Sequence, residues 1–180
     1  MSTDIVIRGE RADHPQVATL LTALDAYLAQ LYPPEANHIL SIDELLAPDV
    51  TFLAAWLGDR VVGTGALRRM AGEPATQGLA YGEIKRMYVT PGLRGGRLGR
   101  RLVESLELAA REEGLTLALL ETGRDQHEAV RLYERCGYVA RAAFGGYPDN
   151  GLSLFMQKSL RACTSAAAGV PATTGERTPA

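Results

Sequence analysis

Several features that define particular protein classes are scarce or missing in this sequence of 180 residues. It contains two cysteines, Cys136 and Cys163, which are too few for a disulfide framework. The three histidines are isolated, and no Cys/His cluster has the spacing of a metal site, so we expect no metal. No apolar run approaches the roughly 18 residues of a membrane span, and no signal peptide opens the chain. We therefore predict a cytoplasmic protein that does not bind membranes.

The sequence also lacks an excess of charge of either sign. Its net charge is −2, with 22% charged and 46% hydrophobic residues, values typical of a soluble globular protein. A nucleic-acid-binding protein usually carries a broad basic surface, so this composition argues against a nucleic-acid partner. The length suits a single domain with a sizeable core.

One segment, residues 83–101, combines a strand, a Gly-rich turn and the start of a helix. The helix start carries Arg94, Arg97, Arg100 and Arg101, although the positive end of a helix dipole favours acidic residues. No Ser, Thr, Asp or Asn is placed to cap it. Bound anions explain this pattern, because free backbone N–H groups and guanidinium groups both bind phosphate. A solvated basic helix end remains the alternative.

The periodicity of apolar residues predicts alternating strands and helices. We expect strands near residues 4–8, 51–57, 61–67, 83–89, 116–120, 138–143 and 152–157. Helices are expected to begin at Asp13, Ser41, Leu98 and Asp125, three of them with a capping-box pattern. The strand, helix and strand that follow residue 83 predict a parallel pair with a right-handed crossover. Residues 1–160 would form the domain, and the Ala-, Thr-, Gly- and Pro-rich residues 161–180 a disordered tail.

Two segments carry a resemblance to a known family. The first contains Arg94, Gly95 and Gly99 after the strand residues 87–89, and the second is residues 125–138, with its Leu-Tyr-x-x-x-Gly-Tyr pattern. Together they resemble the acyl-CoA signature and the second landmark of the GNAT superfamily of N-acetyltransferases. This chain departs from the family pattern at two positions: Arg97 replaces the first signature Gly, and Gln126 replaces an Asn.

The resemblance implies a single mixed α/β domain with a central mixed β-sheet flanked by helices, and acetyl-CoA as cosubstrate. Tyr133 would protonate the departing CoA thiolate, although a tyrosine packed between helix and sheet is the alternative. Main-chain groups of the central strand would polarise the thioester carbonyl. The residues expected to bind acetyl-CoA are Met87, Tyr88, Val89, Arg94, Gly95, Gly96, Arg97, Leu98, Gly99, Arg100, Gln126 and Tyr133.

Residues for the acceptor side follow from the resemblance for the loop residues Glu35 and His38, and from the chemistry of amine acetylation for Glu83 and Arg86. Glu83 would be the general base, acting directly or through a water, or would only bind a cationic acceptor, with Glu121 in reserve. The residues expected to contact the acceptor are Glu35, His38, Glu83 and Arg86. Plain surface-loop or strand-edge positions explain most of these equally well.

The implied activity is transfer of the acetyl group to a primary amine of a small molecule by direct attack in a ternary complex. Two alternatives remain open: an acyl-CoA-binding sensor or interaction module with little turnover, and a protein N-acetyltransferase. A homodimer is compatible with the resemblance. The sequence does not identify the acceptor, because loops 32–40, 70–80 and 144–151 contain no motif that specifies a substrate.

Overall fold

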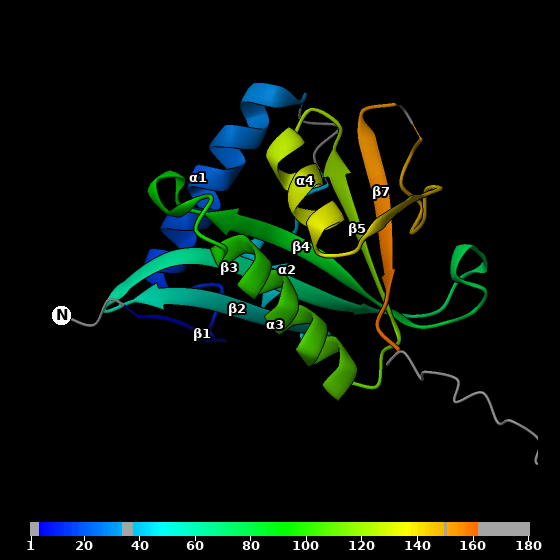
Figure 1. Ribbon diagram of the computed structural model, residues 1–180, viewed down its shortest axis with the longest axis horizontal. Helices are drawn as coiled ribbons and strands as arrows, with labels where there is room; N and C mark the ends of the chain where they lie inside the picture. Colours follow the sequence, from blue (N-terminus) through cyan, green and yellow to red (C-terminus); the bar gives the residue numbers. More distant parts are fainter. Residues whose placement is uncertain (1–3, 34–37, 150, 162–180) are drawn as a thin grey trace, which may run out of the picture.

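The computed structural model describes residues 4–33, 38–149 and 151–161. Seven strands form one sheet in the order β1-β2-β3-β4-β5-β7-β6, and every neighbouring pair is antiparallel except β4 and β5 (Figure 1). The strands are β1 Ile5–Gly9, β2 Val50–Leu57, β3 Arg60–Met70, β4 Tyr81–Val89, β5 Leu117–Gly123, β6 Val139–Arg141 and β7 Ser153–Ser159. This single domain with a mixed sheet confirms the predicted fold class.

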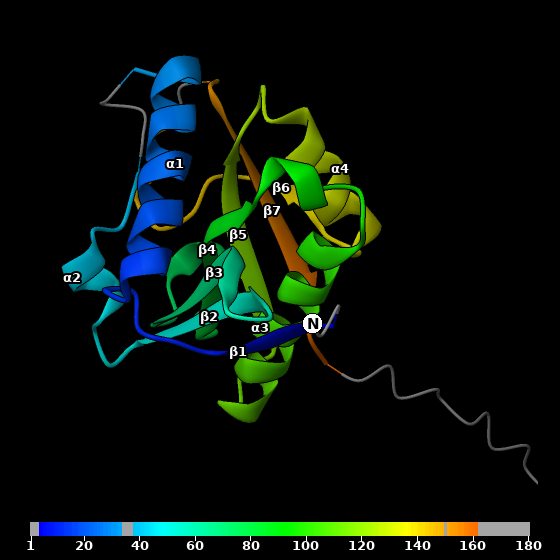
Figure 2. The same ribbon diagram turned by 90° about the vertical axis from the view of Figure 1, so that its left-hand side faces the viewer.

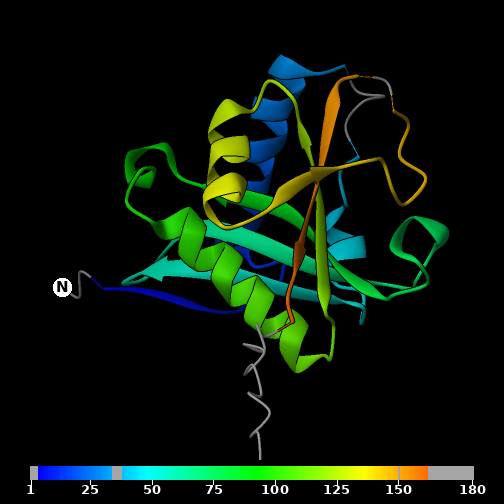
Figure 3. The same cartoon turned by 45° about the vertical axis from the view of Figure 1, so that its right-hand side comes forward.

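Within the described residues, four α-helices cover the two faces of the sheet. They are α1 Pro15–Leu31, α2 Ile42–Leu45, α3 Leu98–Glu112 and α4 His127–Arg135. Figure 2 shows α1 and α2 on one face and α3 and α4 on the other, and Figure 3 shows α3 (green) and α4 (yellow) together on that second face. Among the described helices, none combines the length and apolar character that crossing a membrane requires.

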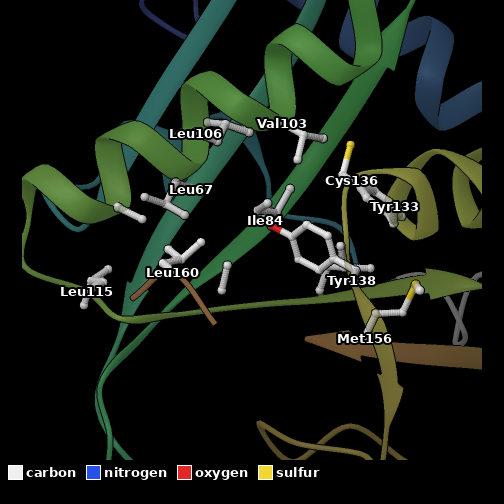
Figure 4. Close-up of a cluster of buried hydrophobic side chains, with 13 residues drawn as sticks. Leu67, Ile84, Val103, Leu106, Leu115, Tyr133, Cys136, Tyr138, Met156 and Leu160 are labelled. Carbon is white, nitrogen blue, oxygen red and sulfur yellow. The ribbon is translucent and has the colours of Figure 1, made fainter. Parts of the chain in front are cut away.

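The largest layer of apolar packing lies between the sheet and the pair α3 and α4 (Figure 4). Ile84 of β4 and Leu120 of β5 pack there against Val103 and Leu106 of α3, and all four side chains are buried. Tyr133 of α4 joins the same cluster. Burying such side chains contributes about 1.5–3 kcal/mol each, so this layer holds α3 and α4 firmly against the diverging strands described below.

Helix starts agree with the sequence prediction at one of three capping patterns. Ser41 caps α2 as predicted: its hydroxyl accepts a hydrogen bond from the Glu44 N–H at 3.3 Å, and its own N–H donates to the Glu44 carboxylate at 2.8 Å. The prediction for Asp13 is wrong. His14 caps α1 instead, and its Nδ1 accepts from the Gln16 N–H at 3.3 Å. Asp13 binds the Arg11 guanidinium at 2.7 and 2.9 Å, which removes its carboxylate from the helix end.

The start of α4 also differs from its prediction. Asp125 was expected to cap this helix, but Gln126 is the cap residue and its side chain makes no capping bond. The Gln126 amide oxygen instead accepts from the Thr122 hydroxyl at 3.0 Å. β5 extends to Gly123, three residues beyond the strand expected near residues 116–120, because it pairs with β7 as far as Gly123. Residues 162–180 of the predicted tail lie outside the described residues.

The central strand β4 is irregular in the middle. The register between β3 and β4 shifts between Thr64 and Ala66, and Arg86 adopts a φ of +56°. Such a bulge bends a strand and re-aims its side chains. The parallel ladder to β5 contains three pairs and ends at Ile84 with Leu120. Beyond that point the arrows of β4 and β5 diverge in Figure 1, with α4 near the opening.

Candidate active site

A cavity of about 1250 Å³ opens where β4 and β5 diverge. Its wall is built from both layers of helices: residues of α1 and the segment after it on one side, and residues of α3 and α4 on the other. Since β4 is paired only with β3 beyond Ile84, its other edge carries main-chain groups without a ladder partner. The residues of this stretch, Met87, Tyr88 and Val89, line the cavity.

The turn after β4 has the backbone that an anion cradle requires. Gly95 has a φ of +79°, and Arg97 has a φ of +66° with a ψ of 0°, both in the left-handed region. α3 begins directly afterwards, without an acidic residue in its first turn and without a side-chain cap. Arg97 therefore takes the conformation that glycine adopts most easily, at a steric cost of roughly 1–2 kcal/mol for a residue with a side chain.

Ten of the twelve residues predicted for the cosubstrate line the cavity: Met87, Tyr88, Val89, Arg94, Gly95, Arg97, Gly99, Arg100, Gln126 and Tyr133. Gly96 and Leu98 do not. The Leu98 side chain is buried against Ala55, Val62 and Leu102, so any role toward a ligand at this position belongs to its main chain.

Gly99 brings α3 and α4 into close contact. A Cβ atom at this position would lie 3.0 Å from Cδ2 of Leu132, tighter than ordinary van der Waals contact. A larger residue at position 99 would separate the two helices. The absence of a side chain at Gly99 therefore sets the width of the cavity at this end.

Arg94 is held in place by several partners. Its Nε donates to the Val89 carbonyl at 3.0 Å, and its Nη1 lies 3.5 Å from the Glu128 carboxylate. Its guanidinium also lies over the rings of Tyr27 and Tyr88, at 5.9 and 5.7 Å from their centroids. These contacts fix one cation at the junction of strand, turn and α1.

Two arginines of α4, Arg131 and Arg135, also line the cavity and were not predicted from the sequence. They are one helical turn apart, so their like charges repel by a few tenths of a kcal/mol. The arginines at the start of α3 indicated an anion because they stand at the positive end of a helix. Arg135 lies in the last turn of α4, where a cation is ordinary, so that signal is absent there.

Tyr133 lies on the wall of the cavity, with 6% of its surface exposed. Its ring packs edge-on against Tyr138, with centroids 5.8 Å apart, and its hydroxyl makes no hydrogen bond to the described residues. Burial raises the pKa of Tyr133 well above its ordinary value. The hydroxyl is thus a neutral donor at pH 7 with no competing partner in the described part of the chain.

Glu83 lies in a buried network and is not part of the cavity wall. Its carboxylate accepts a short hydrogen bond from the Tyr147 hydroxyl and lies 3.3 Å from the Lys85 ammonium. Lys85 also donates to the Tyr147 hydroxyl at 2.6 Å, and it does line the cavity. Burial and the neighbouring Glu83 charge raise the pKa of Tyr147. Any proton that Glu83 takes from the cavity would have to pass through Lys85, Tyr147 or a water.

Glu121, the reserve candidate, does line the cavity. Its carboxylate accepts a hydrogen bond from the Ser153 hydroxyl at 2.5 Å. No cation is within ion-pair distance of it among the described residues. It is therefore a carboxylate that can accept a proton from, or bind, an ammonium group in the cavity.

Of the other residues predicted to contact the acceptor, two line the cavity and one lies outside the described residues. Arg86 lines the cavity, and its buried guanidinium pairs with Asp25 of α1 at 2.5 Å. His38 lines it too, with its ring 4.8 Å from that of Tyr147. Glu35 lies outside the described residues. The structure thus brings His38, Arg86 and Glu121 together on the α1 side of the cavity.

These features fit an extended ligand with phosphates at one end. The turn at Gly95 and Arg97 offers free N–H groups and cations, and the divergent edge of β4 offers main-chain groups farther along. The same cavity holds a neutral phenol, Tyr133, and a carboxylate without a cationic partner among the described residues, Glu121. Such a set can polarise a carbonyl, accept a proton from an amine and donate one to a leaving group.

Known proteins with similar sequences are acetyltransferases. The model of the Acetyltransferase (GNAT) family matches residues 17–138. The IAA acetyltransferase of Azospirillum brasilense is 44% identical over 157 residues, which cover 87% of this chain and 99% of that protein. This match spans the cavity and both signature segments.

Solved structures share the fold. A proposed acyl-CoA N-acyltransferase of Klebsiella pneumoniae has a TM-score of 0.70 and 33% identity, covering 89% of this chain and 100% of its own. The PaiA N-acetyltransferase of Thermoplasma acidophilum, solved in complex with coenzyme A, has a TM-score of 0.67 and 19% identity, covering 87% and 99%. The chain therefore belongs to the GNAT family of acetyltransferases, and it is an acyltransferase with acetyl-CoA as cosubstrate.

Proposed function

We propose that this enzyme transfers the acetyl group of acetyl-CoA to a primary amine of a small molecule by direct attack in a ternary complex. The observation that carries the proposal is the pair Tyr133 and Glu121, which line one cavity where β4 and β5 diverge. One is a neutral proton donor and the other a carboxylate without a cationic partner among the described residues. Acetyl transfer to an amine requires both kinds of group.

The cosubstrate would lie with its phosphates at the turn and its thioester toward the divergent edge of β4. Main-chain groups at Met87, Tyr88 and Val89 would orient and polarise the thioester carbonyl, because they lack a ladder partner on that edge. Tyr133 would donate its proton as the thiolate departs. Its raised pKa keeps that proton in place at neutral pH.

The acceptor would enter from the α1 side of the cavity. Glu121 would accept the proton of the amine, because it lines the cavity while Glu83 does not. Glu83 would instead hold Lys85 and Tyr147 in position. His38 and Arg86 would contact the body of the acceptor, as expected from the sequence. The 44% identity to an IAA acetyltransferase supports a small molecule over a protein as acceptor.

The proposal is tested by CoA release from acetyl-CoA in the presence of amino acids, polyamines, aminoglycosides and peptide N-termini. We expect sustained release with at least one small primary amine, with the acetyl group found on its nitrogen by mass spectrometry. Initial rates at varied concentrations of both substrates should give intersecting lines, the pattern of a ternary complex. Release only with peptides, or an acetylated enzyme as intermediate, would refute the proposal.

A further inference from the structure

The cavity carries more positive charge at its phosphate end than a diphosphate alone can balance. Six arginines line this end: Arg94, Arg97, Arg100, Arg101, Arg131 and Arg135. Two glutamates, Glu104 and Glu128, stand among them and leave four positive charges uncompensated. A diphosphate diester carries about two negative charges at neutral pH, so a surplus of about two remains.

Half of the four uncompensated charges lie at the cradle, on Arg97 and Arg101, where a diphosphate can balance them, and the other half lie on α4. Glu104 pairs with Arg100 at 2.7 Å, Glu128 pairs with Arg94 at 3.5 Å, and Arg101 donates to the Ile5 carbonyl. Arg131 and Arg135 have no ion pair or side-chain hydrogen bond within the described part of the chain. Each is exposed, and both face the same cavity.

The packing of α3 on α4 holds these arginines next to the turn. Gly99 touches Leu132 so closely that a Cβ would lie 3.0 Å from its Cδ2. Arg131 directly precedes Leu132, and Arg135 follows one helical turn after Arg131. The α4 arginines thus lie beside the diphosphate cradle but on a different element, where a second phosphate group of the same ligand can reach them.

We propose that Arg131 and Arg135 bind the 3′-phosphate of the CoA moiety and make the enzyme selective for the 3′-phosphorylated carrier. A phosphomonoester carries close to two negative charges at pH 7, which matches the surplus, and it offers three acceptor oxygens to two guanidinium groups. A ligand also removes the repulsion between two like charges one turn apart. The inference rests on acetyl-CoA as cosubstrate and is independent of the acceptor.

The test compares the affinities of acetyl-CoA and acetyl-3′-dephospho-CoA by calorimetry, without acceptor. The parent enzyme should bind acetyl-CoA more tightly by about tenfold or more, the range expected for hydrogen bonds between charged groups. In the double variant Arg131→Gln/Arg135→Gln this preference should fall below about threefold. Affinity for the dephospho compound should stay near that of the parent, because the cradle is untouched.

Two further double variants serve as controls for the loss of charge and for the loss of the arginine side chains. Arg60→Gln/Arg69→Gln removes the same charge from exposed positions outside the cavity, and it should retain the full preference. Arg131→Lys/Arg135→Lys keeps the charge and should retain most of it. Equal affinity of the parent for both compounds would overturn the inference, as would an unchanged preference in the glutamine double variant. Because no turnover is measured, either result leaves the proposed acetyl transfer to be judged separately.

Discussion

At position 97 an arginine holds the left-handed backbone conformation, with a φ of +66°, at the cap of α3. Glycine adopts this conformation without steric cost and is also an acceptable cap residue. We therefore expect Arg97→Gly to raise the free energy of unfolding by up to about 1 kcal/mol. Binding of acetyl-CoA should change less than about threefold if, as we propose, the backbone N–H of Arg97 and not its guanidinium contacts the diphosphate directly. Urea denaturation and calorimetry measure the two quantities.

A weaker binding of acetyl-CoA by the Arg97→Gly variant would have a different cause. If the guanidinium itself pairs with phosphate, the glycine variant should lose roughly 1–3 kcal/mol of binding free energy, as for a charge-assisted hydrogen bond. A loss in that range, in a protein that remains folded, would contradict the backbone role. Arg97→Gln, which keeps the backbone strain and removes the charge, would then show the same loss.

Glu121 and Glu83 differ in where their carboxylates lie. Glu121 lines the cavity, whereas Glu83 is 4% exposed and bound to Tyr147 and Lys85. We expect Glu121→Gln to lower kcat by roughly 10²-fold with little change in stability, since it removes the carboxylate that we propose as the base. Glu83→Gln should mainly lower stability, because Lys85 loses a buried partner. A large loss of kcat in a stable Glu83→Gln protein, with Glu121→Gln fully active, would restore Glu83 as the base acting through a water.

Among the elements, α3 and β7 are joined by a buried carboxylate. Glu107 is 3% exposed and lies 2.7 Å from the Lys158 ammonium and 3.4 Å from Arg111. Glu107→Ala should lower the free energy of unfolding by about 2–3 kcal/mol, somewhat below the loss for fully buried pairs because the Lys158 side chain is 24% exposed. Urea denaturation of the variant and the parent gives this difference.

Glu112 on the same helix provides the matched control. It is exposed and forms no ion pair among the described residues, so Glu112→Ala should change stability by less than about 0.5 kcal/mol. Equal effects of the two substitutions would show that the ion pairs of Glu107 contribute nothing specific to the joint between α3 and β7.

Elements whose ends are marked by glycines, by capping residues or by unusual charges could be predicted from the sequence. The turn between β4 and α3 is marked by glycines and misplaced arginines, and α2 by the Ser41 capping box. Signals of the same kind failed where a nearer partner competed. Asp13 has Arg11 two residues away, and its carboxylate binds there instead of capping α1. The bulge at Arg86 carries no glycine and gave no signal.

Contacts between residues far apart in the sequence could not be predicted from local patterns, although these contacts determine which side chains line the cavity. Tyr147 binds Glu83 across 64 positions of the sequence, which withdraws the predicted base from the cavity. Arg131 and Arg135 line the same cavity as the Gly-rich turn because Gly99 lets α3 pack closely on α4. The family resemblance placed Tyr133 and the strand residues 87–89 on the cavity wall because both belong to sharply patterned segments.

For the molecule as a whole, the parallel pair β4 and β5 is the decisive feature. It is the parallel pair in an otherwise antiparallel sheet, and its ladder ends after three residue pairs. The resulting opening connects the two faces of the sheet. α3 and α4 line one side of the cavity with cationic residues, and α1 with its following segment lines the other side, where we propose that the acceptor binds.

The measurement that tests this account most directly is kcat of Tyr133→Phe with the best amine of the acceptor panel. The substitution removes one hydroxyl and keeps the ring packing, so acetyl-CoA affinity and thermal stability should barely change. We predict a loss of roughly 10²-fold or more in kcat, because the proton is needed as the thiolate departs. Since burial raises the pKa of Tyr133, the parent should also keep its rate as pH approaches about 10, where a free phenol ionises. A phenylalanine variant that turns over at the parent rate would contradict the account.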